Sequence, residues 1–433
     1  MVAIAPFCAL RYDPQRVGDL SAAVAPPYDV ISPQQQDQLY QRSPYNVVRL
    51  ILGKEFPTDT PADNRYSRAK QTFEDWRAKG VLVRDEAPAL YLCAHTFRWP
   101  PHLSSAQGAD SPPAAGRQVG GWEDRTYRRL GLLALLEFEG SLPDGVLVHE
   151  QTFDAPKRDR AMLMDAVRAH LSPVFCVAPD PQRRMASDLE RLSQTQRPLM
   201  QVRLSDEEVQ VWALTDPEVI QHVRQQMAQA KVLIADGHHR FAVALSRRHL
   251  CGAVMAYISW VNDPGVFVHP IHRVLRLAAG SQEPWRSLLR ARCVLTPAAS
   301  MDGLLSWLSS GSEQGRLGYY EAGRWYQARV QDQLLAEWLM HPSVPLALAG
   351  LDVVLLHHLL IPEGATLSYT PRASEAAALV DSGQADGAWL LRPVALAQIF
   401  ALAEQGFTLP HKTTYFYPKV LSGLVINPFD PVS

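Results

Sequence analysis

The sequence is short of cysteine, of long apolar runs and of net charge, and each shortage excludes a class of protein. With 42 basic and 44 acidic residues the formal net charge is −2, which gives no global electrostatic attraction toward nucleic acid or an anionic membrane and leaves room only for a local basic cluster that binds a small anion. No stretch approaches the ~18–20 apolar residues of a membrane span, and the N-terminus lacks the basic-then-apolar layout of a signal peptide. The few cysteines are far apart and form no CxxC pair: Cys8, Cys93, Cys176, Cys251 and Cys293. We therefore expect a reduced, cytoplasmic protein without a disulfide framework, a zinc ribbon or a membrane partner.

The common nucleotide-binding and hydrolase motifs are missing as well. The chain has no GxxxxGK[ST] loop, no GxGxxG after a strand, no GxSxG elbow and no HExxH helix. Any phosphate or metal chemistry must therefore use another arrangement.

What is present is a globular composition, 47% apolar and 20% charged, over 433 residues. This length predicts two or three domains. We expect a mixed α/β (α+β) fold with several sheets. We predict three regions: an N-terminal α/β region at 1–145 with a hairpin insert at 103–118, a central domain at 146–278, and a C-terminal α+β region at 279–433. The tail of the last region, 408–426, is expected to pack back on the functional site of the central domain.

Apolar periodicity predicts the elements of these regions. Helices are expected at 62–79, 157–170 and 216–230 and from 238 onward, and residues 280–400 carry mostly helical patterns. Strands are expected at 45–51, 89–97, 131–138, 146–148, 174–177, 232–235, 254–261, 266–269, 318–320 and 388–391. The tail 412–419 is aromatic and β-prone.

The strongest local motif is the run from Ile234 to Phe241, in which a buried strand ends, Gly237 permits a tight turn and a helix begins. Free N–H groups at a helix N-terminus bind anions, and Arg240 can add a bidentate contact to phosphate. Asp236 at the strand end can hold a divalent metal or orient a histidine. The structural alternative is an Asp-Gly turn followed by two surface histidines, His238 and His239.

A second motif places His149 and Glu150 at the end of another short strand, where a carboxylate is well placed as a general base. Lys157 and Arg160 follow within a basic cluster that can hold phosphates. The alternative is that this cluster is the solvated face of an amphipathic helix.

Two further groups carry weaker signals. His269 and His272 lie three residues apart, but a zinc site needs three or four ligands, so a structural role is the simpler interpretation. The tail offers Lys412 and Lys419, which can close over an anionic ligand or belong to a terminal strand.

At these residues the sequence resembles the DUF1015 family, a domain of unknown function, over essentially its full length. The matching segments are 25–31, 45–50, 149–160, 171–173, 235–240, 262–265, 272–273 and 412–423. The chain departs from the family in its insert at 103–118 and at Phe241, where a tyrosine is common. The run Asp236-Gly237-His238-His239-Arg240 also resembles the phosphate-binding turn of the ParB/sulfiredoxin superfamily, in which free-serine kinases hold nucleotide phosphates on such a turn and activate the hydroxyl with an upstream glutamate.

These resemblances imply a nucleotide-dependent kinase acting on a small hydroxylated metabolite such as L-serine, with ATP or ADP and Mg²⁺ as cofactors and the phosphorylated metabolite as a partner. Glu150 is then the base, with His149 beside it, and Asp236 is the metal ligand or second base. The phosphate contacts are Gly237, His238, His239, Arg240, Lys157, Arg160, Lys412 and Lys419. The same parts suit a phosphatase. Other hypotheses are a metal-dependent hydrolase using His149, His238, His239 and His272, and a ParB-like DNA-binding or nuclease module.

The kinase hypothesis makes a geometric prediction. If the strands before Glu150 and Asp236 end on the same edge of one sheet, both motifs meet in one cleft, walled by 412–419. If they lie on separate faces, each motif is local structure only.

Overall fold

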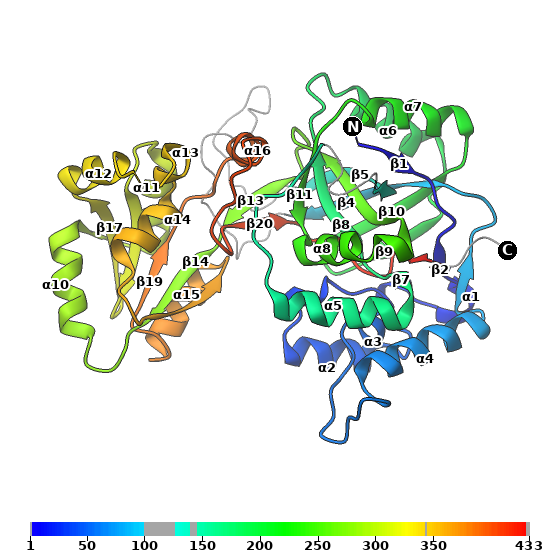
Figure 1. Ribbon diagram of the computed structural model, residues 1–433, viewed down its shortest axis with the longest axis horizontal. Coiled ribbons are helices and arrows are strands. Elements are labelled where there is room, and N and C mark those ends of the chain that lie inside the picture. The colour runs from blue at the N-terminus through cyan, green and yellow to red at the C-terminus, as the bar shows by residue number, and fades with distance from the viewer. Residues whose placement is uncertain (1, 99–125, 139–144, 343, 430–433) are drawn as a thin grey trace.

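The computed structural model describes residues 2–98, 126–138, 145–342 and 344–429. The insert expected at 103–118 lies outside these residues. Figure 1 shows a large lobe, built mainly from the first 260 residues, and a small lobe built from most of the chain between β13 (Phe267–Pro270) and β20 (Thr414–Tyr417). Within the described ranges, no helix is long and apolar enough to cross a membrane.

A nine-stranded mixed sheet forms the centre of the large lobe, in the order β6-β11-β8-β12-β5-β4-β10-β9, with β1 added beside β5. Its strands are β1 (Ile4–Ala5), β4 (Leu90–Arg98), β5 (Thr126–Glu137), β6 (Val146–Leu147), β8 (Val174–Ala178), β9 (Met200–Arg203), β10 (Glu207–Leu214), β11 (Val232–Asp236) and β12 (Ala253–Trp260). Strands β8 and β12 are buried along their whole length, as expected of strands covered on both faces. Strands from both sides of residue 145 belong to this one sheet. A domain boundary at residue 145, as expected from the sequence, would therefore divide a single sheet and its hydrophobic core.

Helices cover the sheet in layers. On one side α5 (Asp154–Val167) packs against both α8 (His238–Ser246) and α4 (Arg65–Ala78), and α6 (Arg184–Thr195) and α7 (Pro217–Met227) lie at the opposite end of the lobe (Figure 1). The remaining elements of this lobe are β2 (Leu10–Tyr12), α1 (Pro14–Val17), α2 (Pro33–Arg42), α3 (Val48–Ile51), β3 (Leu82–Arg84), β7 (Ala169–His170), α9 (Arg248–Cys251), β21 (Asn427–Pro428) and the 3₁₀ turns Leu20–Ala22 and Tyr28–Val30.

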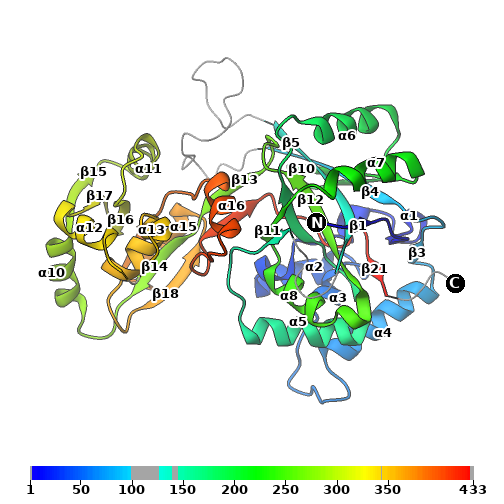
Figure 2. The same cartoon turned by 45° about the horizontal axis from the view of Figure 1, so that its top comes forward.

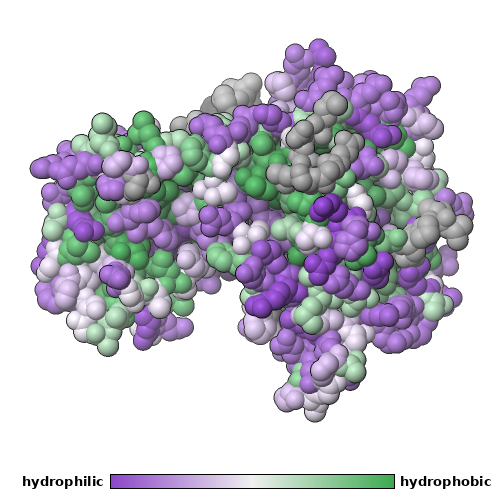
Figure 3. Space-filling view, in the orientation of Figure 1, coloured by the Kyte–Doolittle hydropathy of each residue, from purple (hydrophilic) through white to green (hydrophobic). Residues whose placement is uncertain are grey.

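The small lobe contains a six-stranded sheet in the order β15-β17-β16-β19-β14-β18. These strands are β14 (His272–Arg276), β15 (Cys293–Ala298), β16 (Arg316–Glu321), β17 (Arg324–Val330), β18 (Thr366–Thr370) and β19 (Gly387–Leu390). Its helices are α10 (Gln282–Arg292), α11 (Met301–Ser310), α12 (Asp332–Leu339), α13 (Leu346–Ala349), α14 (Asp352–Leu355), a π-helical turn Leu356–Leu360 and α15 (Ala373–Asp381). Helix α16 (Leu396–Glu404) lies between the lobes and contacts β6 of the large lobe. Figure 3 shows hydrophobic surface on this lobe. Its exposed large apolar residues include Val294, Met340 and Leu346.

The two lobes are joined by a two-stranded ribbon. Strand β13 (Phe267–Pro270) leaves the large lobe and pairs antiparallel with β20 (Thr414–Tyr417), which returns toward it. Both views in Figures 1 and 2 place this ribbon between the lobes. We call residues 409–419 the C-terminal strap. After the strap the chain re-enters the large lobe, where β21 pairs with β7.

Two predictions of local structure are wrong. The expected strand at 45–51 is a short helix, α3, because the side chain of Asn46 accepts the N–H of Val48 at 2.9 Å and caps a turn. Residues 280–400 hold β15, β17 and β18 in addition to the expected strands. Strand β18 lies at the sheet edge and is mostly exposed, so its sequence lacks the apolar alternation that marks a strand.

Candidate functional site

The site begins at two parallel neighbouring strands. Strand β6 pairs with β11 in parallel, with Val146 opposite Val232 and Leu147 opposite Leu233. Both strands therefore end at the same edge of the sheet, and the polar residues that follow them, Glu150 and Asp236, emerge side by side.

A cavity of about 560 Å³ opens at this edge. It lies where the large lobe, the small lobe and the C-terminal strap meet, and Glu150 and Arg240 both line it, which confirms the predicted shared cleft. The sequence-predicted residues in its lining are Glu150, Asp236, Gly237, His238, His239, Arg240, Lys412 and Lys419.

Glu150 is held by the strap and by α8. The backbone N–H of Lys412 donates to Glu150 Oε1 at 3.1 Å, His411 Nδ1 lies 3.0 Å from the same oxygen, and His238 Nδ1 lies 3.6 Å from Oε2. Burial alone raises the pKa of Glu150, but the contacts with His411, His238 and Lys412 outweigh it and lower the pKa to about 2. The carboxylate is therefore ionised at neutral pH and ready to accept a proton.

Asp236 is held between two cations. Its Oδ2 accepts a hydrogen bond from Arg240 Nη2 at 2.6 Å, and its Oδ1 accepts one from Lys419 Nζ. Burial raises the pKa of Asp236, but the charges of Lys419 and Arg240 exceed this effect and hold the pKa well below its usual value. Because the positive charges of Arg240 and Lys419 together exceed the single negative charge of Asp236, a further cation would be repelled, and Asp236 does not fit the expected role of a Mg²⁺ ligand.

Gly237 allows the turn to close. Its φ is +91°, and a Cβ placed there would lie 2.9 Å from the Arg240 guanidinium carbon, so a side chain would push Arg240 away. Arg240 also donates to the carbonyl of Pro173. The guanidinium thus fixes the turn and Asp236 together.

Three helix N-termini contribute to the lining of the cavity. They belong to α2 through Gln34 and Gln35, to α8 through His238 and His239, and to α15 through Arg372. The first N–H groups of a helix have no intrahelical acceptor and carry partial positive charge, which favours anions.

The three histidines of the motifs occupy different depths. His149 does not line the cavity: it is buried behind it, stacks edge-on against His238 with ring centroids 4.6 Å apart, and shares a hydrogen bond with Thr414 Oγ1 at 3.1 Å. Burial lowers the pKa of His149 to about 3 and that of His238 to about 4. The buried Nε2 of His238 has no hydrogen-bond partner among the described residues. His239 is less buried and its Nε2 accepts the N–H of Phe153 at 3.1 Å.

Lys157 and Arg160 lie outside the cavity lining. Lys157 points to Asp154 on its own helix at 3.0 Å. Arg160 is buried, pairs with Asp159, donates to the carbonyl of Ile51 at 2.7 Å and lies 3.8 Å above the ring of Tyr28. Since Tyr28 lines the cavity, Arg160 supports its wall from behind instead of contacting its contents.

The sequence reasoning missed most of the small-lobe wall and part of the large-lobe wall. The additional lining residues include Tyr28, Asp29, Tyr369, Thr370, Arg372, Glu375 and His411, whereas Tyr415 belongs to the tail 412–419 that was predicted to wall the cleft. The conspicuous Pro26-Pro27-Tyr28 loop was a usable signal for Tyr28 and Asp29. Nothing near Tyr369 to Arg372 marks a site, because these residues become relevant only when β18 ends against the large lobe.

The described residues contain no group of three or more His, Cys, Asp or Glu side chains arranged to hold a metal ion. His272, one of the four histidines of the metal-hydrolase hypothesis, is buried, and its Nδ1 accepts the N–H of Leu391 at 3.3 Å. The described part of the chain therefore gives that hypothesis no support.

The chain matches the family described as a protein of unknown function, DUF1015, over residues 4–107 and 117–354, and it belongs to that family. No curated protein matches its sequence.

Three solved structures resemble this chain at low similarity. A free serine kinase in complex with AMP is 12% identical, with a TM-score of 0.35 over 66% of this chain and 86% of that one. SbnI with a C-terminal truncation, from Staphylococcus aureus, is 13% identical, with a TM-score of 0.37 over 67% and 85%. A conserved hypothetical protein from Pyrococcus furiosus is 14% identical, with a TM-score of 0.32 over 66% and 90%.

Proposed function

We propose that the protein is a nucleotide-dependent kinase that transfers a phosphoryl group to the hydroxyl of a small metabolite, with L-serine as the first candidate. The observation that carries this proposal is the meeting of an ionised carboxylate, Glu150, with the N-terminus of α8 in one cavity of about 560 Å³. Phosphoryl transfer depends mainly on positioning and charge stabilisation, and this cavity supplies both.

Charged side chains of both signs line the cavity. Its lining contains four carboxylates (Asp29, Glu150, Asp236 and Glu375) and four permanently charged cations (Arg240, Arg372, Lys412 and Lys419). Asp236 engages Arg240 and Lys419, so Lys412 and Arg372 are the lining cations that form no ion pair with another described residue. We assign the nucleotide phosphates to the space between these two side chains and the N-terminus of α8.

Glu150 receives the proton of the acceptor hydroxyl. The acceptor oxygen forms a bond to the terminal phosphorus of the nucleotide, the bond from that phosphorus to the bridging oxygen breaks, and the rest of the nucleotide (ADP from ATP, AMP from ADP) leaves with the bridging oxygen. With a pKa of about 2, Glu150 is too weak a base to ionise a free hydroxyl. It takes the proton late, once bonding to phosphorus has made the hydroxyl acidic.

Calorimetric titration with ADP and ATP, followed by a phosphoryl-transfer assay with radiolabelled ATP and L-serine, tests the proposal. Binding of both nucleotides and formation of labelled phosphoserine support it. Phosphate release from phosphoserine without nucleotide would instead favour a phosphatase using the same residues. Absence of nucleotide binding at millimolar concentration would overturn the proposal.

A further inference from the structure

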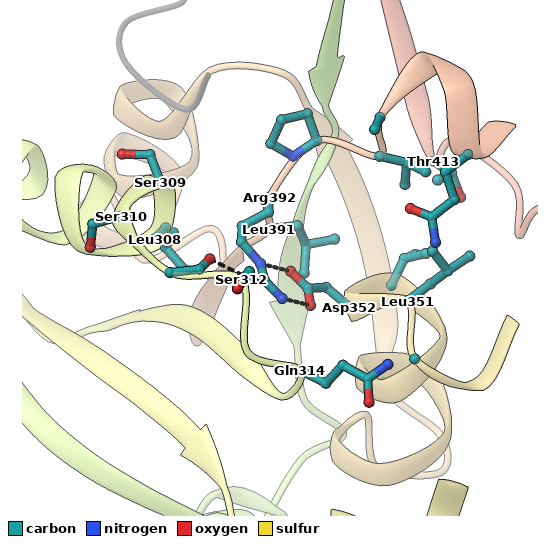
Figure 4. Close-up of a pocket in the computed structure, with 17 residues that line it drawn as sticks. Leu308, Ser309, Ser310, Ser312, Gln314, Leu351, Asp352, Leu391, Arg392 and Thr413 are labelled. Atoms are coloured by element: carbon teal, nitrogen blue, oxygen red, sulfur yellow. Dashed lines mark hydrogen bonds and ion pairs between the residues drawn. The ribbon is translucent and has the colours of Figure 1, made fainter. Parts of the chain in front are cut away.

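A second cavity, of about 500 Å³, lies in the small lobe and has no part in the proposed function. Figure 4 shows it between the end of α11, the start of α14 and the segment that follows β19, with Thr413 of the C-terminal strap on its far side. The size is within the usual range of small-molecule sites, roughly 300–1,000 Å³.

An ion pair forms part of the wall of this cavity. Arg392 Nε donates to Asp352 Oδ2 at 2.7 Å and Arg392 Nη2 donates to Oδ1 at 2.6 Å, while Nη1 donates to the carbonyl of Gly311 at 2.9 Å (Figure 4). A guanidinium has five N–H groups, so two remain for a ligand. Asp352 is only 8% exposed. A buried ion pair contributes little net stability compared with apolar residues of the same shape, so its presence in a cavity wall is not explained by stability.

The rest of the lining is polar and uncharged. Arg392 and Asp352 are its only ionisable residues among the described part of the chain, so its formal charge is zero, and the other polar lining side chains are Ser309, Ser310, Ser312, Gln314, Gln398 and Thr413. Ser312, Gln314 and Gln398 line the cavity, are exposed, and make no hydrogen bond with another described residue. Such a lining disfavours a polyphosphate and suits a ligand without net charge that has several hydrogen-bonding groups.

The second cavity is connected to the first through the strap. Thr413 lines the second cavity, and its neighbours Lys412 and Thr414 line the first. The N–H of Lys412 holds Glu150, and the buried Arg273 of β14 donates to the carbonyls of Lys412 at 2.9 Å and His411 at 3.1 Å. A ligand that contacts Thr413 therefore acts on the segment that positions Glu150.

We propose that the second cavity binds a zwitterionic α-amino acid of zero net charge, and that its occupancy is coupled through the C-terminal strap to the cavity around Glu150. Arg392 keeps two N–H groups for a carboxylate, and the Asp352 carboxylate keeps a lone pair for an ammonium group, while an α-amino acid presents a carboxylate and an ammonium one carbon apart. The serine, threonine and glutamine side chains then contact its polar side chain. The binding site does not depend on the proposed kinase function; the coupling refers to the same Glu150 cavity.

Calorimetry with L-serine and L-glutamine, with glycerol as an uncharged control, tests the binding. We expect both amino acids to bind and glycerol not to bind. The double variant Gln314→Ala/Gln398→Ala changes two exposed side chains and should weaken amino-acid affinity about tenfold through loss of two hydrogen bonds. Arg392→Lys keeps the charge but loses the planar contacts of the guanidinium, and it should also weaken amino-acid affinity. The control is Arg286→Lys, which alters an ion pair elsewhere in the same lobe and should leave amino-acid affinity unchanged.

A second pair of measurements separates the two cavities. Amino-acid binding that survives Arg240→Ala but is weakened in the glutamine double variant supports the second cavity, even if no nucleotide binds anywhere. Amino-acid binding that is lost in Arg240→Ala and kept in the double variant belongs to the first cavity and overturns the proposal. The proposal is also overturned if glycerol alone binds or if neither amino acid binds.

A further titration tests the coupling between the cavities. Saturating amino acid should change the ADP dissociation constant at least threefold, and Thr413→Ala should reduce that change. An unchanged ADP affinity would refute the coupling.

Discussion

The backbone N–H of Lys412 donates to Glu150 Oε1 at 3.1 Å, although 262 residues separate them in the chain. The same strap is fixed at Leu409, whose N–H donates to the carbonyl of His149 at 2.7 Å. The environment of Glu150 is therefore built by the end of β6, by α8 and by the C-terminal strap together.

Replacing Glu150 by glutamine should reduce phosphoryl transfer by a factor of about 10²–10⁴ and leave ADP affinity nearly unchanged, because an amide keeps the shape but cannot take a proton. Steady-state kinetics and calorimetry of the variant measure the two effects. Glu375→Gln is the matched control, since Glu375 lines the same cavity on the opposite lobe. Equal loss in both variants would show that the general charge of the cavity matters and not proton transfer at Glu150.

Gly237→Ala should lower ADP affinity, because the new Cβ would lie 2.9 Å from the guanidinium carbon of Arg240. The positive φ adds about 1–2 kcal/mol of backbone strain. Gly252→Ala is the control: its φ is also positive, +64°, but nothing lies within 4 Å of its Cβ. Both variants should lose similar stability in urea unfolding, and only Gly237→Ala should lose affinity. Equal ADP affinities in the two variants would contradict a role for the turn in binding.

The free energy of unfolding should fall as the pH is lowered from 7 to 5. The pKa values of His149 and His238 are about 3 and about 4 in the folded protein, below the ordinary value of 6.5. The unfolded chain therefore binds more protons in this range, and stability rises with pH. Urea unfolding at several pH values measures the slope. His149→Gln should flatten it, whereas His249→Gln, at an exposed position, should leave it unchanged; an equal slope in all three proteins would rule out buried neutral histidine as its source.

Arg273→Gln should loosen the C-terminal strap, because it removes the hydrogen bonds to the carbonyls of His411 and Lys412. We expect faster cleavage by trypsin after Lys412, together with lower turnover and little change in the Michaelis constant for nucleotide. Arg276→Gln is the matched control, since Arg276 lies on the same strand but is exposed and donates to the carbonyls of Gly383 and Gln384. Protection of Lys412 from trypsin in Arg273→Gln would mean that other contacts hold the strap.

Part of this site follows directly from local sequence. The apolar run 232–235, the Asp-Gly turn and the following helix are determined within about fifteen residues, because a buried strand, a residue with positive φ and a helix start each leave a local pattern. The same holds for the strand before Glu150. The prediction that both strands end at one edge was correct because parallel neighbours align their carboxyl ends.

The partners of these residues were decided only by the tertiary structure. Hydrophobic periodicity shows which side of an element is buried but not which element covers it. Arg160 was expected to hold phosphate and instead supports Tyr28, because α5 turns that side chain toward the loop behind the cavity wall. Asp236 was expected to hold a metal and instead meets Lys419, which is 183 residues away and is brought there by the strap. The sequence by itself determined the strand, turn and helix that present the site, since their interactions are local, whereas the charges that neutralise Asp236 and orient Glu150 depend on contacts between distant segments that only the folded chain brings together.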